Sequence, residues 1–456
     1  MKYLKNIKKY ISLIIIAAVI LSVPAVSADM QQALKPQITA SAFVLMDGDT
    51  GQVLLEKNMH EKMYPASITK IMTVLLALER GQLSDVITMS HDAVFSITHW
   101  NSSNIALDEN EMLTLEQALY SLSIASANDA SNGIAEHISG SATAFAEQMT
   151  QRAKQAGALK TNFTNAHGLP DDEHYTTAHD MARIMSDAIK NPKFLEIFST
   201  EIYNMPPTNI QPEARQFNRR YSLISGDFTY DGVIAEKTGW TGAAGVTFAA
   251  AARRGERTLV AVVMQAAEEI SRRTDTAALF DYGFNEFVPV SFSAGEIAKQ
   301  NHVIDIAEGL SVNTRLSAAE DFNALILKSL SKDDIKIKYI IAADENGRLQ
   351  GRALFMLETG QTSRAGTDNM FAELGEIALE INNVSRETLE NAPAEYVQEY
   401  AEQRPVIFKI FEITGIGVFI LLFLFLLLII RKHIIIHTRK KRKSNGRAVH
   451  FRSNYR

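Results

Sequence analysis

Ser67 and Lys70 are the first residues in the sequence whose types and spacing could do covalent chemistry. The apolar positions of residues 68–78 predict a helix that begins just after Pro65. Residues three apart share a helix face, so the serine hydroxyl and the lysine amine can come within hydrogen-bond distance, as in an activated nucleophile. Backbone N–H groups at the start of the helix would also favour developing negative charge. Alone, the spacing is weakly specific, because many chains contain it by chance.

Two further polar motifs follow in the chain. Ser126-Ala127-Asn128 lies between two predicted helices and brings a hydroxyl and an amide to their junction, although helix capping would use the same residue types. Lys237-Thr238-Gly239 begins a predicted strand, where the glycine would let a ligand backbone approach closely, although an ordinary turn is the alternative. The order, separation and predicted context of the three motifs make the combination far more specific than any one of them.

An α/β domain is predicted to position these residues. Two strand-like segments flank residues 47–51 and predict a hairpin. Residues 114–189 are helix-rich, with a capping box at Thr114 and Gln117 and helices expected at about 129–138, 143–155 and 178–189. A second hairpin around Gly255 and a helix at about 273–284 follow. Strands, helices and strands again predict an antiparallel sheet, flanked by helices and interrupted by a helical insertion.

The remainder of the chain has a different character. Residues 289–383 contain strand-like segments and predict a small β-rich domain, in which 318–330 would alternatively be helical. Residues 384–404 are polar and acidic, which is typical of a stalk. The expected domains are a signal peptide (1–28), a catalytic domain (29–286), the β-rich domain (287–383), the stalk (384–404), a transmembrane helix (411–430) and a basic tail (431–456).

Composition excludes several classes of function. The chain has 456 residues, 46% of them hydrophobic, and no cysteine, which excludes disulfides, thiol catalysis, thiolate metal sites and iron–sulfur clusters. The formal net charge is -6. Residues 29–430 carry 32 of the 46 basic and all 52 acidic residues, a net charge of −20 between two basic ends. An acidic body of this kind argues against nucleic-acid binding.

Two apolar segments predict where the protein resides. Residues 1–28 have a lysine-rich start, an apolar run at 11–23 and small residues before a cleavage site, which indicates a secretory signal; an uncleaved anchor is the alternative. Residues 413–430 form an uncharged apolar stretch long enough to span a bilayer, followed by a cluster of lysines and arginines. Positive charge marks the cytoplasmic side, so the body is expected outside a bacterial cell membrane and the C-terminus inside.

The three motifs together resemble the signature of penicillin-binding proteins and class A β-lactamases. The resemblance is to low-molecular-weight penicillin-binding proteins, which are serine-type D-alanyl-D-alanine carboxypeptidases, and it covers about residues 35–285. Residues 64–73, 126–130, 162–169 and 237–245 all resemble blocks of that family. The resemblance implies a penicillin-binding-protein-like α/β fold, removal of the terminal D-alanine from peptidoglycan stem pentapeptides, covalent inhibition by β-lactams and no cofactor.

The resemblance also implies residue roles. Ser67 would attack the substrate carbonyl and form an acyl-enzyme, and Lys70 would act as general base, since burial and a nearby cation lower the pKa of a lysine. The remaining roles are a proton shuttle (Ser126), positioning of substrate and base (Asn128), binding of the substrate carboxylate (Lys237, Thr238, Gly239) and an oxyanion hole made by the backbone N–H groups of Ser67 and Trp240.

Some features depart from the family pattern. Glu236 places an acid beside a carboxylate-binding lysine, but neighbouring residues of a strand face opposite sides, so we expect it to point away from the substrate. The predicted span replaces the amphipathic C-terminal helix common in the family. His167, His174 and His179 have no metal-ligand spacing, so no metal is expected.

Other functions remain open from the sequence. A D,D-endopeptidase or transpeptidase would use the same residues with a different leaving group or acceptor. A β-lactamase would need a glutamate to activate water, and residues 171–174 lack the pattern that supplies one. A non-catalytic wall-binding protein is the fourth possibility, and the retention of all three motifs argues against it.

Overall fold

The computed structural model describes residues 35–97, 102–220, 222–307, 310–343, 349–362 and 369–382. They belong to two compact units. Of the described residues, the first contains those up to Ser291 together with those within Asn323–Lys336 and Met356–Gly375, and the second contains those within Phe292–Phe322, Ile337–Phe355 and from Glu376 to Asn382.

The centre of the first unit is a five-stranded antiparallel sheet with the order β2-β1-β9-β8-β7. Both predicted hairpins are present in it. Its strands are β1 (Ala42–Asp47), β2 (Val53–Lys57), β7 (Val233–Thr241), β8 (Gly245–Arg254) and β9 (Arg257–Ala266). The helical segment of the chain lies between β2 and β7, so the predicted α/β fold with a helical insertion is confirmed.

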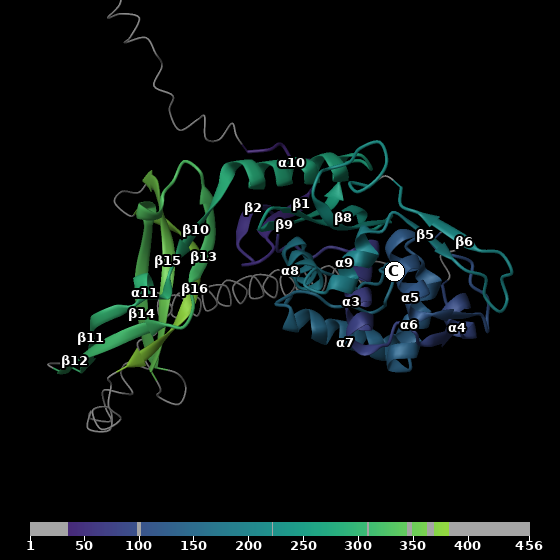
Figure 1. Cartoon of the computed structure of the whole chain (residues 1–456), viewed down its shortest axis with the longest axis horizontal. Coiled ribbons are helices and arrows are strands. Elements are labelled where there is room, and N and C mark those ends of the chain that lie inside the picture. Colours follow the sequence, from purple (N-terminus) through teal and green to yellow (C-terminus); the bar gives the residue numbers. More distant parts are fainter. Residues whose placement is uncertain are drawn as a thin grey trace, which may run out of the picture. The chain divides into compact units, whose positions relative to one another are not determined.

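Helices cover both faces of this sheet (Figure 1). The 3₁₀ turn η1 (Ala66–Thr69) leads into α3 (Lys70–Arg80). The further helices are α4 (His91–Phe95), α5 (Leu115–Ile124), α6 (Asn128–Ser139), α7 (Ala142–Gln155), α8 (Ala178–Ala188), α9 (Pro192–Ser199) and α10 (Ser271–Glu286). Two short hairpins accompany them: β3 (Val86–Thr88) with β4 (Met112–Thr114), and β5 (Ile202–Met205) with β6 (Arg215–Asn218). The capping box of Thr114 and Gln117 begins α5, as predicted.

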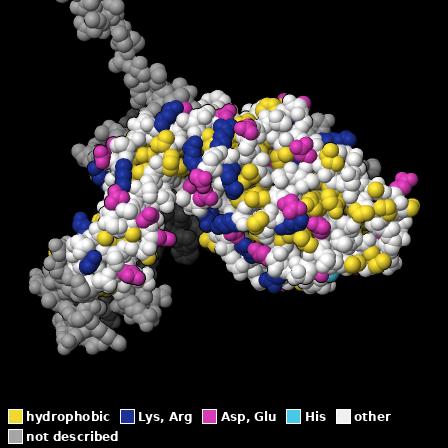
Figure 2. All heavy atoms as spheres, viewed as in Figure 1, with side chains coloured by type: hydrophobic (Ala, Val, Ile, Leu, Met, Phe, Trp, Pro, Cys, Tyr) yellow, Lys and Arg dark blue, Asp and Glu magenta, His cyan; other side chains and the backbone are white. Residues whose placement is uncertain are grey.

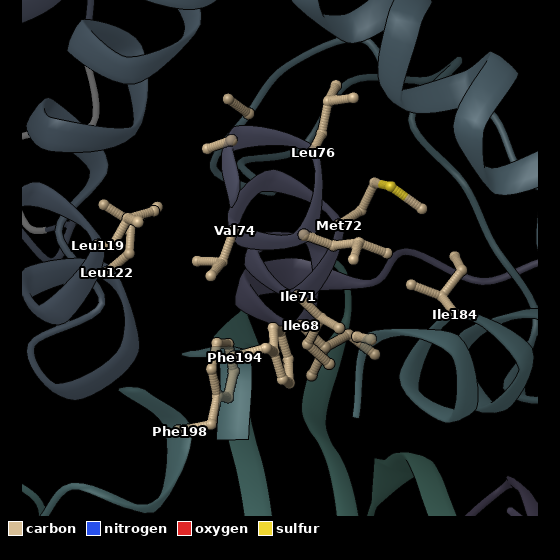
Figure 3. Close-up of a cluster of buried hydrophobic side chains, with 14 of the residues drawn as sticks. Ile68, Ile71, Met72, Val74, Leu76, Leu119, Leu122, Ile184, Phe194 and Phe198 are labelled. Carbon is tan, nitrogen blue, oxygen red and sulfur yellow. The ribbon is translucent and has the colours of Figure 1, made fainter. Parts of the chain in front are cut away.

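Helix α3 is the core of the helical layer, because apolar side chains surround it (Figure 3). Ile71, Val74 and Leu76 are fully buried on it, against side chains of α5, α8 and α9. Burying one such side chain contributes about 1.5–3 kcal/mol, so this packing fixes the helix that carries Lys70. A second apolar cluster, which includes Phe248 and Phe280, packs α10 on the other face of the sheet.

The remaining elements are mostly strands. A second five-stranded sheet has the order β11-β12-β16-β15-β14. The elements are β10 (Phe287–Phe292), α11 (Ala294–Ile297), β11 (Lys299–Ala307), β12 (Leu310–Ala318), β13 (Phe322–Leu327), η2 (Lys332–Asp334), β14 (Ile335–Ala343), β15 (Leu349–Thr362) and β16 (Asn369–Asn382). Phe322 and Phe355 stack in the second unit with ring centroids 3.6 Å apart. The alternative of a helix at 318–330 is wrong, since residues 322–327 form β13.

Several expectations concern residues outside the described ranges: the signal peptide (1–28), the stalk (384–404), the transmembrane helix (411–430) and the basic tail (431–456). Within the described ranges, no helix combines the length and apolar character needed to cross a membrane. On the face of the molecule in Figure 2, acidic and basic side chains are intermixed, with apolar side chains between them.

Candidate active site

Ser67 lies on the 3₁₀ turn η1, where the chain enters helix α3. The preceding Ala66 has a φ of 50°, a left-handed conformation that costs energy for a residue with a Cβ. Strand β7 passes so close that a Cβ on Gly239 would lie 2.8 Å from the Ser67 nitrogen. The close approach that the structure shows at Gly239 is therefore to the backbone of Ser67.

The Lys70 amine has three polar neighbours. Its Nζ lies 3.1 Å from Ser67 Oγ, 2.6 Å from Asn128 Oδ1 and 2.8 Å from the backbone oxygen of His167. An ammonium group can donate to all three, whereas a neutral amine has two hydrogens for the two carbonyl-type oxygens and one lone pair left. In the neutral form that lone pair is available to the Ser67 hydroxyl.

Burial favours this neutral form. The Lys70 side chain is fully buried, and burial together with the nearby Lys237 cation lowers its pKa well below the usual value. Asp129 acts in the opposite sense and raises it. The net direction suits a lysine that accepts a proton from serine.

Ser126 and Lys237 form the second polar contact of the site. Lys237 Nζ donates to Ser126 Oγ at 3.0 Å and to the Thr238 carbonyl at 3.1 Å. Ser126 lies between α5 and α6 with a φ of 58°, a strained conformation. Asn128 is the first residue of α6, but its side-chain oxygen accepts from Lys70, so the capping alternative does not apply to it.

Lys237 is almost fully buried, and its pKa is lowered to about 7. Burial is the main cause, Arg219 and Arg272 add to it, and Glu236 opposes it. The two lysines of the site therefore both have lowered pKa values, and each contacts one of the two serine hydroxyls.

A cavity of about 650 Å³ opens beside these residues. Ser67, Ser126 and Asn128 line it together with residues 238–243 of β7 and the following turn, and Trp240 is 66% exposed on it. The rest of the lining comes from Ser102, Ser103, residues 168–170, Glu269 and Arg272. This volume suits a small ligand or a short peptide end. Six of the eight predicted site residues thus line one cavity. The other two, Lys70 and Lys237, are buried and donate to two of the lining residues, Ser67 and Ser126.

The sequence of residues 162–169 resembles a family block but did not predict that this loop contacts Lys70. Its His167 carbonyl binds Lys70, and its Ala166 carbonyl accepts from Thr73 Oγ1 at 2.6 Å. At Gly168 (φ 90°) a Cβ would lie 1.9 Å from the Ala66 oxygen, so the loop lies directly against η1. This contact has no sequence signature, because every residue type supplies a backbone carbonyl.

Of the histidines weighed as metal ligands, His174 packs within the loop and His179 lies on α8. His174 is buried, its Nδ1 accepts from the Thr164 backbone N–H at 3.0 Å, and its Nε2 lies 2.9 Å from Thr69 Oγ1. Burial lowers the pKa of His174 to about 4. His179 lies 3.4 Å from Asp180 Oδ1. Within the ranges that the structure describes, no three His, Cys, Asp or Glu side chains are grouped to hold a metal ion.

The α/β fold and the Ser67–Lys70 pair define the class of penicillin-binding-protein-like serine peptidases. The family described as D-alanyl-D-alanine carboxypeptidase matches residues 29–268, and the chain belongs to this family.

Individual relatives agree with this assignment. D-alanyl-D-alanine carboxypeptidase DacA of Haemophilus influenzae is 31% identical over 377 residues, which cover 79% of this chain and 92% of the relative. DacF of Bacillus subtilis is 32% identical over 306 residues, 65% of this chain and 75% of the relative.

Solved structures are similar as well. Penicillin-binding protein 5 of Haemophilus influenzae has a TM-score of 0.59 and 27% identity, covering 76% of this chain and 98% of that chain. A variant of a Streptomyces DD-transpeptidase has a TM-score of 0.52 and 26% identity, covering 55% of this chain and all (100%) of that chain.

Proposed function

We infer that the chain is a serine-type D-alanyl-D-alanine carboxypeptidase that removes the terminal D-alanine from peptidoglycan stem pentapeptides. Family membership supports the activity, and the contact between Lys70 Nζ and Ser67 Oγ at 3.1 Å is the single structural observation that supports the mechanism best.

The reaction would proceed in two halves. Ser67 Oγ attacks the carbonyl carbon of the last peptide bond while its proton passes to neutral Lys70. The tetrahedral intermediate collapses and the C–N bond breaks. The proton that Lys70 took from Ser67 passes through Ser126 to the leaving nitrogen, so that D-alanine leaves as an amine and Lys70 is neutral again. Water then attacks the acyl-ester with Lys70 as base again, which frees the shortened peptide and restores Ser67.

Two sets of donors would hold the substrate during these steps. Lys237 and Thr238 bind the terminal carboxylate, a group that every stem peptide ending in D-alanine presents. The backbone N–H groups of Ser67 and Trp240 stabilise the developing oxyanion. The closeness of β7 to η1 at Gly239 supports this arrangement, because it brings both backbone segments to the same wall of the cavity.

β-Lactams would inhibit this site covalently, since they present a strained acyl group and a carboxylate to the same residues. The matched test compares wild-type protein with Ser67→Ala. We expect wild-type protein to release D-alanine and to retain a fluorescent penicillin through denaturation, and the variant to do neither. Labelling that survives the substitution would mean that the nucleophile is not Ser67.

A transpeptidase is the second candidate, favoured by the likeness to the Streptomyces enzyme. In that reaction an amine of a second peptide replaces water in attacking the acyl-ester. Adding a peptide with a free amino group to the assay distinguishes the two, because a transpeptidase would form a coupled product.

We propose further that the protein is exported by residues 1–28 and held in a bacterial cell membrane by residues 411–430, with the catalytic domain outside. The apolar segment 413–430 and the basic cluster after it support this topology. Protease added to intact cells should digest the catalytic domain and spare an epitope placed after residue 456; digestion of both or of neither would contradict it.

A further inference from the structure

Glu236 is a buried acid on the strand that carries Lys237. It pairs in register with Ala250, which belongs to the apolar cluster under α10, whereas Lys237 pairs with Ala249 on the opposite face of the sheet. The expectation that Glu236 points away from the substrate face agrees with this register. Its side chain is only 1% exposed, so its carboxylate must be satisfied by protein groups.

Those groups come from the segment that precedes β7. Glu236 Oε2 accepts from the Leu223 backbone N–H at 2.8 Å, and its Oε1 lies 3.8 Å from Arg219 Nη1. The guanidinium of Arg219 is itself only 6% exposed. A buried carboxylate and a buried guanidinium therefore lie side by side behind the wall that presents Lys237.

Arg219 connects helix α5 with strand β7. Its Nη2 donates to Ser123 Oγ at 2.8 Å near the end of α5, and its Nη1 lies 3.5 Å from the Glu236 backbone oxygen on β7. Its Nε donates to the Thr200 carbonyl at 3.1 Å. Ser123 is three residues before Ser126. Arg219 therefore links β7 to the end of α5, close to the hydrogen bond by which Lys237 of β7 contacts Ser126.

More positive than negative groups act on the pKa of Lys237. Arg219 and Arg272 both disfavour its cationic form, and Glu236 favours it. Lys70 is a further cation-forming group beside it. Each of these groups has its own charged neighbours: Glu201 acts on Arg219, Arg273 and Glu269 on Arg272, Asp227 on Arg273, and Asp129 on Lys70.

We propose that Glu236 is a positioning residue that acts through Lys237: its carboxylate holds Arg219 against β7 and keeps Lys237 cationic while the substrate carboxylate binds. The proposal rests on the proposed function, since it assumes a substrate with a free terminal carboxylate. This role would explain why an acidic residue lies next to a lysine that binds an anionic substrate group.

The test is the pH profile of kcat/KM for the full chain with two peptides, one ending in a free D-alanine carboxylate and one in the amide. In Glu236→Gln the side-chain amide oxygen can still accept from the Leu223 backbone N–H, but the negative charge of the carboxylate is lost. We expect its alkaline limb on the carboxylate peptide to move to lower pH, because the removed carboxylate favours the cationic form of Lys237. The amidated peptide should show no such shift.

Arg219→Gln provides a second variant with the opposite expectation. Removing that positive charge should move the alkaline limb on the carboxylate peptide to higher pH, a reversal that general structural damage would not produce. Glu256→Gln, the same change on the exposed turn between β8 and β9, is the matched control and should leave both profiles unchanged.

An unmoved alkaline limb in Glu236→Gln, an equal shift for both peptides, or shifts of the same sign in the two variants would each overturn the proposal while wild-type activity upholds the proposed function. Wild-type protein that releases no D-alanine at any pH would overturn the proposed function, and this proposal with it.

Discussion

The amine of Lys70 and the hydroxyl of Ser67 face each other at 3.1 Å in a site where the lysine has no access to water. The hydrogens of a neutral Lys70 are taken by Asn128 and by the carbonyl of His167, at 2.6 and 2.8 Å. Burial therefore lowers the proton affinity of Lys70, and its two acceptors orient the remaining lone pair. Lys70 is therefore placed to act as the base for Ser67.

Lys70→Arg should be inactive, although it keeps the positive charge of the protonated state. A guanidinium does not lose its proton in proteins, so it cannot act as the base. Loss of a general base typically costs about 10²–10⁴-fold in rate, and we expect a loss of that size in both D-alanine release and penicillin acylation. Near wild-type acylation by the folded variant would mean that another group takes the Ser67 proton.

Lys237→Ala should discriminate between substrates by their C-terminal group. A hydrogen bond to a charged group contributes about 1.5–3 kcal/mol, so kcat/KM for a peptide with a free carboxylate should fall about 10- to 100-fold. The matching amide should lose much less. Equal losses on the two peptides would remove the carboxylate-binding role of Lys237.

Gly168→Ala tests the loop below the site. The added Cβ would lie 1.9 Å from the Ala66 oxygen, at a φ of 90° that disfavours any side chain. The loop must move, and the His167 carbonyl moves away from Lys70 with it. We expect a lower thermal midpoint and a lower kcat; Gly140→Ala, at a φ of 77° with nothing within 4 Å of its Cβ, is the control for backbone strain alone. A Gly168→Ala protein with wild-type kcat would show that the loop does not position Lys70.

His174 should make the protein less stable in mild acid. Its pKa is about 4 in the folded chain, below the usual 6.5 of an unfolded one, because burial disfavours the charged form. Its stabilising contribution is complete above about pH 6.5 and is lost as the pH falls toward 4, where the unfolded chain binds the extra proton.

The expected loss between pH 7 and pH 4.5 is roughly 2–3 kcal/mol of unfolding free energy. His174→Gln lacks the titrating ring, so urea unfolding at the two pH values should show a smaller loss by about that amount. The same loss in both proteins would assign the acid sensitivity to other groups.

Local patterns predicted much of this structure. The capping box of Thr114 and Gln117, the turn at Gly255 and the helical periodicity after Pro65 are set by residues close together in the chain, so the sequence shows them directly. The three motifs predicted residues that the fold brings into contact with one another, because their chemistry depends on residue type.

Long-range contacts could not be predicted in the same way. The left-handed backbone at Ala66 and Ser126 is imposed by packing around η1 and between α5 and α6, and neither residue type favours it. The Arg219–Glu236 contact joins a loop to a strand through a bend that no local pattern specifies. Residues 318–330 were open to a helical reading because a short apolar run has no decisive period, and strand pairing decides it.

Incubation of the full chain with a purified pentapeptide muropeptide, followed by mass analysis, tests the central claim most directly. The account predicts a product that has lost one D-alanine, with no coupled peptide, and no product when Ser67→Ala is used. An intact pentapeptide after incubation with folded wild-type protein, or a cross-linked product in place of the shortened one, would contradict it.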